Sequence, residues 1–493
     1  MGRIRWRNLV VPLVVALAGP PIAGAATFPV TTDADRRDAA LDGVCEATAG
    51  IGDCTLRAAI AEANATAAPD VIQLAGVRYT LTITGAGEDA GATGDLDVTG
   101  PLTIQGAGRS NTVLSGRGLG DRVLDVASRA FLRLNDVGVR DGRAADGGDV
   151  RVRKGGRLTM LRGDVLFGDA KTGGGLSVDG SATLQRTTLM HNAADRGGGI
   201  ANRGSLNLDG VEIAENSATQ GGGLHTSGAV LLRASAVARN SATAGSGILQ
   251  AKGTTATIAK VRVSGLEVQR TTIAHNASRT SAAVVVRAGD VALSDVTIAR
   301  NTRATGGTGG IEASGPFRAR NSLFAINAGV NCDPKAASLG GNLSDDKSCV
   351  TPNAALSDRV AKTELGELVR SVGPTPAMEL PPGSPAVDAG LGCQARDQRG
   401  FPRPAGPGCD TGAYEIHPPD FTASAGDDVD MNPGDGTCAT AAGACTLRAA
   451  VQEANALAGP QAVRLRGRAF ALTIAGANED GAATGDLDVP RTS

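Results

Sequence analysis

Eight cysteines are the clearest candidates for specific chemistry in this sequence, because they occur as four couples of close neighbours. Such couples form disulfides in an oxidising compartment, although the sequence alone does not prove the connectivity. A metal site is disfavoured, since there is no C-x-x-C pair and none of the four histidines stands at ligand spacing from a cysteine. We predict four disulfides, joining Cys45 to Cys54, Cys332 to Cys349, Cys393 to Cys409 and Cys438 to Cys445.

A short acidic segment offers a second kind of chemistry, cation binding. Glu88, Asp89, Asp95 and Asp97 are close in sequence, and the glycines between them permit a tight loop. Carboxylate oxygens suit Ca²⁺, so these residues are candidate calcium ligands and calcium is the one candidate cofactor. Their spacing does not match an EF-hand loop, and a solvated turn explains them as well. The segment recurs at 479–488.

Catalysis by paired carboxylates is not indicated. An enzyme acting on acidic polysaccharide needs two carboxylates at catalytic separation, or an aspartate cluster for Ca²⁺ with a basic residue beside it. The aspartates of the central region share no common phase along the chain: Asp179, Asp195, Asp209 and Asp295. We assign no catalytic residue and keep a polysaccharide-active enzyme as the alternative function.

A repeat defines the elements that must position these residues. Glycine triplets begin at residues 173, 197 and 221, with a degraded copy at 245, so the period is 24 residues. A fixed period of this length is typical of a solenoid in which each repeat forms one coil. An asparagine keeps the same phase and then loosens its spacing, at Asn192, Asn216, Asn240, Asn276, Asn301 and Asn327.

Each repeat contains brief runs of alternating apolar and polar residues, as in 182–189 and 204–213. Alternation this short indicates strands rather than helices. Strands of successive coils should lie about 4.8 Å apart, so roughly nine or ten coils would form a rod on the order of 45 Å long. We predict an all-β fold, a right-handed parallel β-helix.

Glycine and asparagine are expected at the corners of the coils. Glycine allows positive φ or close backbone approach, and asparagine is the next best residue for a left-handed corner. Asn192, Asn216 and Asn240 are also expected to stack into an internal ladder that bonds the turns above and below. The residue before each asparagine varies, which predicts a side chain that points to solvent.

The first 25 residues have the pattern of a secretory signal peptide. Arginines at positions 3, 5 and 7 precede an apolar stretch from 9 to 18, and Ala23-Gly24-Ala25 fits a cleavage site. The apolar stretch is too short to span a bilayer, and no later segment is long enough either. We expect cleavage near Ala25, no membrane span, and a secreted or cell-surface location.

Composition narrows the choice of partners. The formal net charge is -2 and no long basic stripe occurs, which argues against nucleic acid as a partner. Trp6, the only tryptophan, lies in the segment expected to be cleaved, and aromatic residues make up 2% of the chain. A carbohydrate module built on stacked tryptophan is therefore disfavoured.

One module occurs twice, outside the coils. The segment 54–98 aligns with 445–489 without a gap. Both copies predict a short helix with a threonine N-cap, Thr55 or Thr446, and an apolar stripe of leucine, alanine and isoleucine or valine. A helix of this kind can cover the open end of a β-helix. We expect an N-terminal capping helix and a partial second copy of the cap at the C-terminus.

These motifs resemble known families. The phrase CTLRAA at 54–59 and 445–450 is similar to the CSLREA domain of exported bacterial β-helix proteins, with alanine in place of the family's glutamate. The segment 331–415 resembles the choice-of-anchor Q domain, and the coils resemble repeats of polymorphic outer membrane proteins. The resemblance implies a bacterial, exported protein with surface attachment, but no anchoring motif is visible.

The predicted organisation has six parts: a signal peptide (1–25), a cap module (26–100), coils (101–330), a closing segment (331–417), a linker (418–434) and a truncated second cap (435–493). The expected function is an exported, non-catalytic scaffold, adhesive or ligand-presenting. Its expected partner is an unidentified extracellular ligand, such as a glycan or a host or cell-surface protein. An inert fragment of a larger repeat protein is the third hypothesis, because the second cap is followed by no coils before Ser493.

Overall fold

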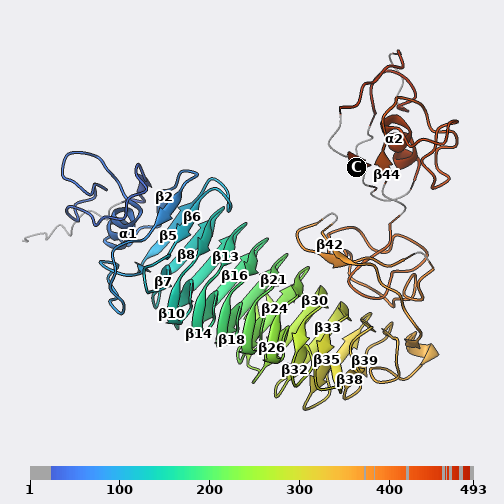
Figure 1. The fold of residues 1–493 in the computed structure, drawn as a ribbon, viewed down its shortest axis with the longest axis horizontal. Coiled ribbons are helices and arrows are strands. Elements are labelled where there is room, and N and C mark those ends of the chain that lie inside the picture. Colours follow the sequence, from blue (N-terminus) through green and yellow to red (C-terminus); the bar gives the residue numbers. More distant parts are fainter. Residues whose placement is uncertain are drawn as a thin grey trace, which may run out of the picture.

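The computed structural model describes residues 24–370, 373–381, 383–417, 421–457, 461, 463–465, 469–476 and 481–488. Nearly all of the expected signal peptide lies outside these residues, as do 418–420 of the expected linker. The predicted parallel β-helix is confirmed: short strands wind into a rod and pair in parallel with the strands of the next coil (Figure 1). A ten-stranded sheet with one strand per coil gives ten turns.

Three parallel ladders form the walls of the rod. The ten-stranded ladder comprises β4 (Leu96–Val98), β7 (Leu124–Val126), β11 (Val150–Val152), β15 (Leu176–Val178), β19 (Ile200–Asn202), β23 (Leu224–Thr226), β27 (Ile248–Gln250), β32 (Val284–Val286), β35 (Thr308–Ala313) and β38 (Val330–Asp333). The seven-stranded ladder comprises β10 (Arg143–Asp146), β14 (Asp169–Thr172), β18 (Ala193–Arg196), β22 (Ser217–Gln220), β26 (Ser241–Ala244), β31 (Ala277–Ser278) and β34 (Thr302–Arg303).

The 22-stranded ladder is made of two columns with a corner between them in most coils. The first column holds β1 (Thr27–Pro29), β2 (Asp70–Gln73), β5 (Pro101–Gln105), β8 (Phe131–Asn135), β12 (Arg157–Leu161), β16 (Ser181–Gln185), β20 (Ser205–Asp209), β24 (Ala229–Arg233), β36 (Arg318–Arg320) and β39 (Ala337–Ser338). The second holds β3 (Arg78–Thr80), β6 (Val113–Ser115), β9 (Gly138–Arg140), β13 (Asp164–Leu166), β17 (Thr188–Met190), β21 (Glu212–Ala214), β25 (Ala236–Ala238), β37 (Leu323–Ala325), β40 (Leu343–Ser344) and β41 (Arg359–Val360), while β30 (Leu266–Ala274) and β33 (Val291–Ala299) span both.

The core is a stack of aliphatic side chains that point inward from alternate strand positions. Val98, Val126, Val152 and Val178 lie in register on four successive coils and are fully buried. Because each coil covers the apolar face of the previous one, the solenoid needs no globular core.

The glycine triplets have the two roles expected of them. The first glycine of each triplet adopts a left-handed conformation, for example φ 65° at Gly173 and 66° at Gly197. The second glycine faces the next coil so closely that a Cβ on Gly198 would lie 2.4 Å from the Ser217 carbonyl oxygen. A side chain at that position would force the coils apart.

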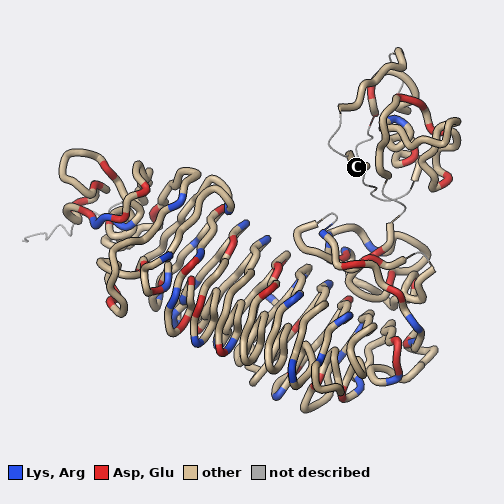
Figure 2. Tube along the Cα trace, in the orientation of Figure 1, with Lys and Arg blue, Asp and Glu red and all other residues tan. Residues whose placement is uncertain are grey.

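The prediction that asparagine itself occupies a left-handed corner is wrong. The left-handed residue is the one before it, with φ of 58° at His191 and 56° at Glu215, and its side chain is exposed as predicted. This arrangement turns the asparagine side chain into the interior. Charged residues recur along successive coils (Figure 2).

An antiparallel hairpin of β28 (Thr255–Ile258) and β29 (Val261–Ser264) explains why the asparagine spacing loosens after Asn240. The hairpin is inserted in one coil and packs Ile258 and Val263 on the outward-facing Leu231 of β24. Leu231 is an apolar residue at an outward-facing position and so interrupts the alternation of polar and apolar residues. This interruption is the signal in the sequence that another segment packs on the strand.

The cap modules have the helices that the sequence predicts, α1 (Leu56–Asn64) and α2 (Leu447–Ala456), each with its threonine N-cap accepting a backbone hydrogen bond. α1 closes the first coil, and its apolar side chains belong to the solenoid core. In the second copy, β44 (Phe421–Ala423) pairs with β45 (Val463–Leu465), as β1 pairs with β2.

The second cap has no coil beneath it among the described residues. Leu465 is 56% exposed, whereas Leu74, at the matching position of the first copy, is 6% exposed. Leu472 and Leu81 differ in the same way, at 44% and 3%. The apolar face that the first cap buries against coils is therefore open in the second.

After the last coils the chain turns back along the rod. This returning segment, residues 363–417, includes β42 (Leu368–Val369) and β43 (Ala377–Met378), and it follows a short 3₁₀ helix, η1 (Ala354–Leu356). The coils therefore extend past the predicted boundary at 330: the first part of the predicted closing segment forms coil strands β38, β39, β40 and β41, and its second part covers the coil wall.

Candidate functional site

A column of corner residues runs along the rod between the two halves of the 22-stranded ladder. Each corner residue adopts a left-handed conformation with φ between 46° and 65°. The residues, one per coil, are Asp136, Arg162, Arg186, Gly210, Ala234, Arg270, Asp295 and Asn321. We call this set the corner column.

The returning segment crosses the corner column at positions where the residues of the column are small. A Cβ on Gly210 would lie 3.2 Å from a ring carbon of Pro374, so glycine leaves room for the proline. The Thr375 hydroxyl donates to the Ala234 carbonyl at 3.1 Å. Gln398 accepts from the Thr272 hydroxyl at 2.6 Å and is fully buried. The segment is therefore held against specific coils.

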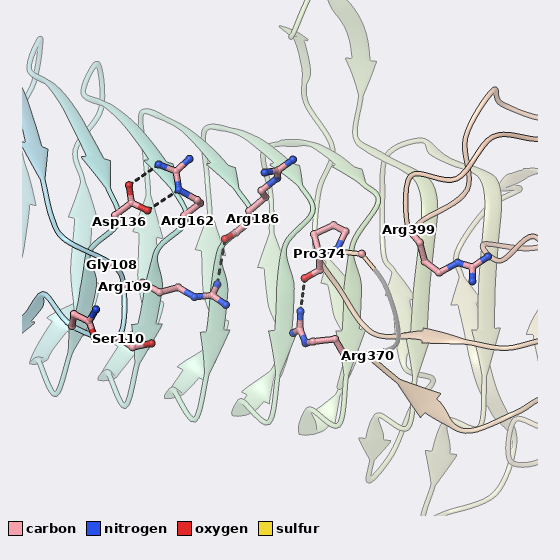
Figure 3. Close-up of a pocket in the computed structure, with 11 residues that line it drawn as sticks. Gly108, Arg109, Ser110, Asp136, Arg162, Arg186, Arg370, Pro374 and Arg399 are labelled. Atoms are coloured by element: carbon pink, nitrogen blue, oxygen red, sulfur yellow. Dashed lines mark hydrogen bonds and ion pairs between the residues drawn. The ribbon is translucent and has the colours of Figure 1, made fainter. Parts of the chain in front are cut away.

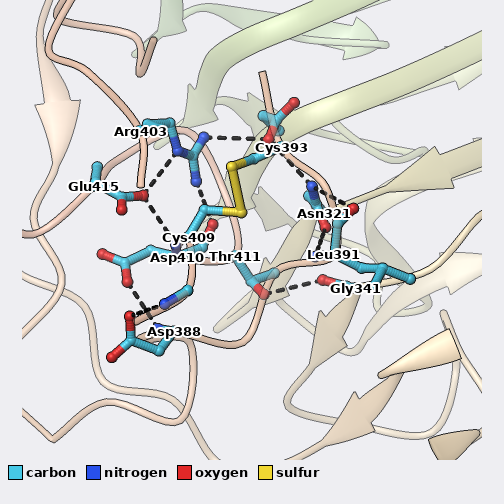
Figure 4. The surroundings of a disulfide bond; sticks show 12 residues. Asn321, Gly341, Asp388, Leu391, Cys393, Arg403, Cys409, Asp410, Thr411 and Glu415 are labelled. Atoms are coloured by element: carbon cyan, nitrogen blue, oxygen red, sulfur yellow. Dashed lines mark hydrogen bonds and ion pairs between the residues drawn. A yellow bond between two sulfur atoms is a disulfide. The ribbon is translucent and has the colours of Figure 1, made fainter. Parts of the chain in front are cut away.

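A buried ion pair secures the rest of the segment (Figure 4). The fully buried Arg403 guanidinium bonds Asp295 of the corner column at 3.2 Å and Glu415 at 2.8 Å. The Thr411 hydroxyl donates to the Gly341 carbonyl at 3.0 Å, and the Leu391 amide donates to Asn321 at 2.6 Å. The Cys393–Cys409 disulfide lies among these contacts.

A groove opens where the returning segment leaves the corner column (Figure 3). Its volume is about 710 Å³. One wall comes from the coils and the other from the returning segment. Five arginines and a single carboxylate line it: Arg109, Arg162, Arg186, Arg370, Arg399 and Asp136, together with Gly108, Ser110, Asn111, Gly373 and Pro374. We call it the arginine groove.

The arginines of the coil wall are oriented by their neighbours. Arg162 forms a two-pronged pair with Asp136, with Nε 2.6 Å from Oδ1. This hydrogen bond holds the pKa of Asp136 below its ordinary value. Arg109 donates to the Arg186 carbonyl at 3.4 Å and lies 3.5 Å from Asp164.

The opposite wall contributes two more guanidinium groups. Arg370 pairs with Glu212 of β21 and also donates to the Pro374 carbonyl. Arg399 pairs with Asp397 at 2.8 Å, and its guanidinium carbon lies 3.6 Å from the centre of the Tyr414 ring. These contacts fix the second wall, and they bury the Arg399 side chain, which is 4% exposed.

The acidic segment beside the first cap forms a separate cluster. Asp89, Asp97 and Asp125 place carboxylate oxygens within 4.8 Å of one another. Asp97 and Asp125 are brought side by side by the register of β4 and β7. Arg153 bonds both Asp89 and Asp125, and Arg151 also bonds Asp125. The guanidinium groups take donor positions around these carboxylates, so the cluster is an ion-pair network.

The remaining calcium candidates have other partners. Asp95 pairs with Arg122 at 2.6 Å. Glu88 accepts hydrogen bonds from the backbone of its own loop, at Ala90 and Thr93. The structure therefore brings Asp89 and Asp97 together with Asp125, which sequence analysis did not single out, and directs Asp95 and Glu88 elsewhere. The second copy of the segment lies partly outside the described residues.

Burial raises the pKa of two of these carboxyl groups. Burial raises the pKa of Asp97 to about 7, and the nearby charge of Asp95 adds to the shift. Burial also raises the pKa of Asp95 to about 6, although Arg122 opposes it. The hydrogen bond from Arg153 lowers the pKa of the exposed Asp89. Guanidinium groups already bound to these carboxylates weaken a cation site, so we derive no metal chemistry from the cluster.

The asparagines form a continuous internal ladder. The side-chain nitrogen of Asn192 donates to Asn216 at 2.9 Å, and that of Asn216 donates to Asn240 at 3.0 Å. The series continues from turn to turn through Asn276, Asn301 and Asn327, and Asn327 donates to Asn331, four residues further along the chain. All are buried, so the ladder satisfies interior polar groups and takes no part in an external site.

The four predicted disulfides are present: Cys45–Cys54, Cys332–Cys349, Cys393–Cys409 and Cys438–Cys445. No described helix has the length and apolar character to cross a bilayer.

The aspartates in the coils do not converge on a catalytic pair. Asp179 pairs with Arg203, Asp209 with Arg233, and Asp295 with Arg403. Asp195 is exposed.

His225 of β23 is half-buried, and burial lowers its pKa to about 4, with nearby arginines adding to the shift.

No protein-family model, curated protein or solved structure matches this chain. The function proposed below is supported by the residues and their arrangement.

Proposed function

We propose that the protein is an exported, non-catalytic extracellular or cell-surface β-helix that binds its ligand along the side of the rod. The arginine groove carries this proposal, because it is a concave site built on rigid coils and fixed by a returning segment. Four disulfides support export, since such bonds persist in oxidising compartments. The resemblance of the caps to exported bacterial proteins supports the same location.

Binding without turnover follows from the groove's carboxylate content. Among the described residues, Asp136 is the single carboxylate that lines it, and both of its oxygens are engaged by Arg162. Hydrolysis of a glycosidic bond ordinarily needs two carboxyl groups, one of them free to give a proton. The polysaccharide-active enzyme remains the alternative, and a reducing-sugar release assay decides between the two. Turnover by the purified protein would replace the scaffold proposal.

Export and binding can be tested together. The mature protein, recovered from outside the producing cells, should begin near residue 26 by mass spectrometry and contain no free thiol. Immobilised on a sensor, it should retain extracellular glycans or surface proteins from a defined panel. An intracellular protein with an intact N-terminus and reduced cysteines would contradict export, and failure to retain any member of the panel would contradict the binding role.

A further inference from the structure

Of the five arginines of the groove, Arg186 is the one without a carboxylate partner among the described residues, since Arg109 pairs with Asp164 and Arg399 with Asp397. Arg162 and Arg370 each pair with one carboxylate, Asp136 and Glu212. Arg186 is exposed, and no described residue accepts a hydrogen bond from its guanidinium group. A guanidinium group has five N–H donors, so even the paired arginines retain donors for a ligand.

The positive groups are arranged along the rod. Arg162 and Arg186 occupy the same corner of successive coils, because β12 and β16 pair in register. One coil step is about 4.8 Å. Arg109 reaches toward Arg186 from an earlier coil, and Arg370 faces them from the returning segment (Figure 3). A linear ligand lying parallel to the rod would meet Arg162 and Arg186 one step apart, with Arg109 and Arg370 beside them.

The chemistry of the lining selects the ligand class. Arginine recognises carboxylate and sulfate groups through two parallel hydrogen bonds. No aromatic side chain is among the described residues that line the groove, so these residues offer nucleic-acid bases no stacking platform. The chain's net charge is -2, so the chain as a whole does not supply the electrostatic attraction on which nucleic-acid binding depends. We propose that the arginine groove binds an anionic polysaccharide, a linear glycan bearing uronate carboxylates or sulfate esters.

This inference rests on the proposed binding function and names its ligand class. Arg186→Asp is the most direct variant. Aspartate already occupies the same corner at Asp136 with φ 58°, so the backbone accepts it, and the exposed side chain leaves the core intact. Arg109→Gln removes a second charge without reversing it. Arg143→Gln is the matched control, because Arg143 is 79% exposed and lies on the separate seven-stranded ladder.

The test measures binding of the full mature chain to polygalacturonate, dextran sulfate and unsubstituted dextran by calorimetry at two salt concentrations. We expect binding to at least one polyanion, no binding to dextran, and weaker binding at high salt. Arg186→Asp should weaken polyanion binding roughly tenfold or more and Arg109→Gln by less. Arg143→Gln should bind like the parent protein. Preference between polygalacturonate and dextran sulfate identifies carboxylate or sulfate as the recognised group.

Three results would overturn the inference: polyanions binding no better than dextran, Arg186→Asp binding like the parent, or Arg143→Gln weakening binding as much as Arg186→Asp. The proposed function is judged separately by the ligand panel. If the exported protein retains other extracellular ligands while Arg186→Asp has no effect on polyanions, the scaffold role stands and the anionic glycan does not.

Discussion

Asp149 occupies the place of an asparagine at the start of the internal ladder. In the two coils before Asn192 the ladder position is a glycine, Gly142 or Gly168. The Asp149 side chain fills the space: its Oδ1 accepts from the Gly142 amide at 2.8 Å, and its Oδ2 has no hydrogen-bond partner among the described residues. Burial raises the pKa of this fully buried carboxyl well above its ordinary value.

Asp149→Asn should therefore stabilise the protein at pH 8 and have little effect at pH 4. The folded state holds a proton that the unfolded state releases above about pH 4, so stability falls as pH rises toward the folded-state pKa. Asparagine removes this dependence, and we expect a gain on the order of 1–2 kcal/mol at pH 8. Denaturant unfolding at both pH values measures it. The exposed Asp195→Asn is the control, and an equal loss of stability at both pH values for Asp149→Asn would contradict the argument.

The close approach of coils at the glycine triplets gives a second prediction. Gly198→Ala places a Cβ 2.4 Å from the Ser217 carbonyl oxygen and 2.5 Å from that of Gly222, both of them backbone atoms that cannot turn aside. We expect a loss of roughly 3 kcal/mol, at the upper end for overpacking. Gly315→Ala has open space around its Cβ and should change the unfolding midpoint little. Equal effects of the two variants would show that the coils are not in contact at the triplet.

The 24-residue repeat allowed the solenoid and its asparagine ladder to be predicted from the sequence. Contacts between segments that are far apart in the chain could not be predicted in this way. The phase of Asn192 and Asn216 indicated the ladder, because a solenoid places equal positions above one another. The arginine groove was missed because Arg370 and Arg399 reach the coils only when the chain folds back. A signal was present in Arg162 and Arg186, which keep the 24-residue phase. Asp125 was missed for a similar reason, since it joins Asp97 only through strand register.

The helices of the two caps each contain an arginine at the equivalent position with equivalent partners. The two helices differ in what their apolar faces contact. Arg57 of α1 bonds Asp35 at 2.7 Å and the backbone carbonyls of Gly91 and Gly94. Arg448 of α2 bonds Asp427 at 2.7 Å and two equivalent carbonyls. The apolar face of α1 joins the solenoid core, whereas the core contains no residue of α2.

Arg57→Met should therefore expose the first coils to solvent exchange. Its loss leaves Asp35 buried without its partner, a change that typically costs about 3–5 kcal/mol. Hydrogen exchange should increase in α1, β4 and β7. Arg448→Met is the matched control and should increase exchange only within 421–488. If both variants left β4 and β7 protected, the first cap would not be stabilising the open end of the solenoid.

At the scale of the whole molecule, the returning segment links coils that would otherwise contact only their neighbours. A solenoid unfolds by local opening because each coil depends on the adjacent ones. The returning segment touches Ala234, Thr272 and Asp295, which lie on three successive turns, and it also supplies one wall of the arginine groove. Stability and ligand binding should therefore be coupled through it.

Arg403→Met tests this coupling far from the groove itself. The variant leaves the buried Asp295 and Glu415 without their cation, and a loss of about 3–5 kcal/mol is typical of such a change. Detachment of the segment should increase hydrogen exchange in β30 and β33, and it should weaken polyanion binding because Arg370 and Arg399 leave the groove wall. Arg396→Met, an exposed arginine of the same segment, should alter neither measurement. Faster exchange with unchanged polyanion binding would mean that the coil wall alone holds the ligand and that the returning segment serves only stability.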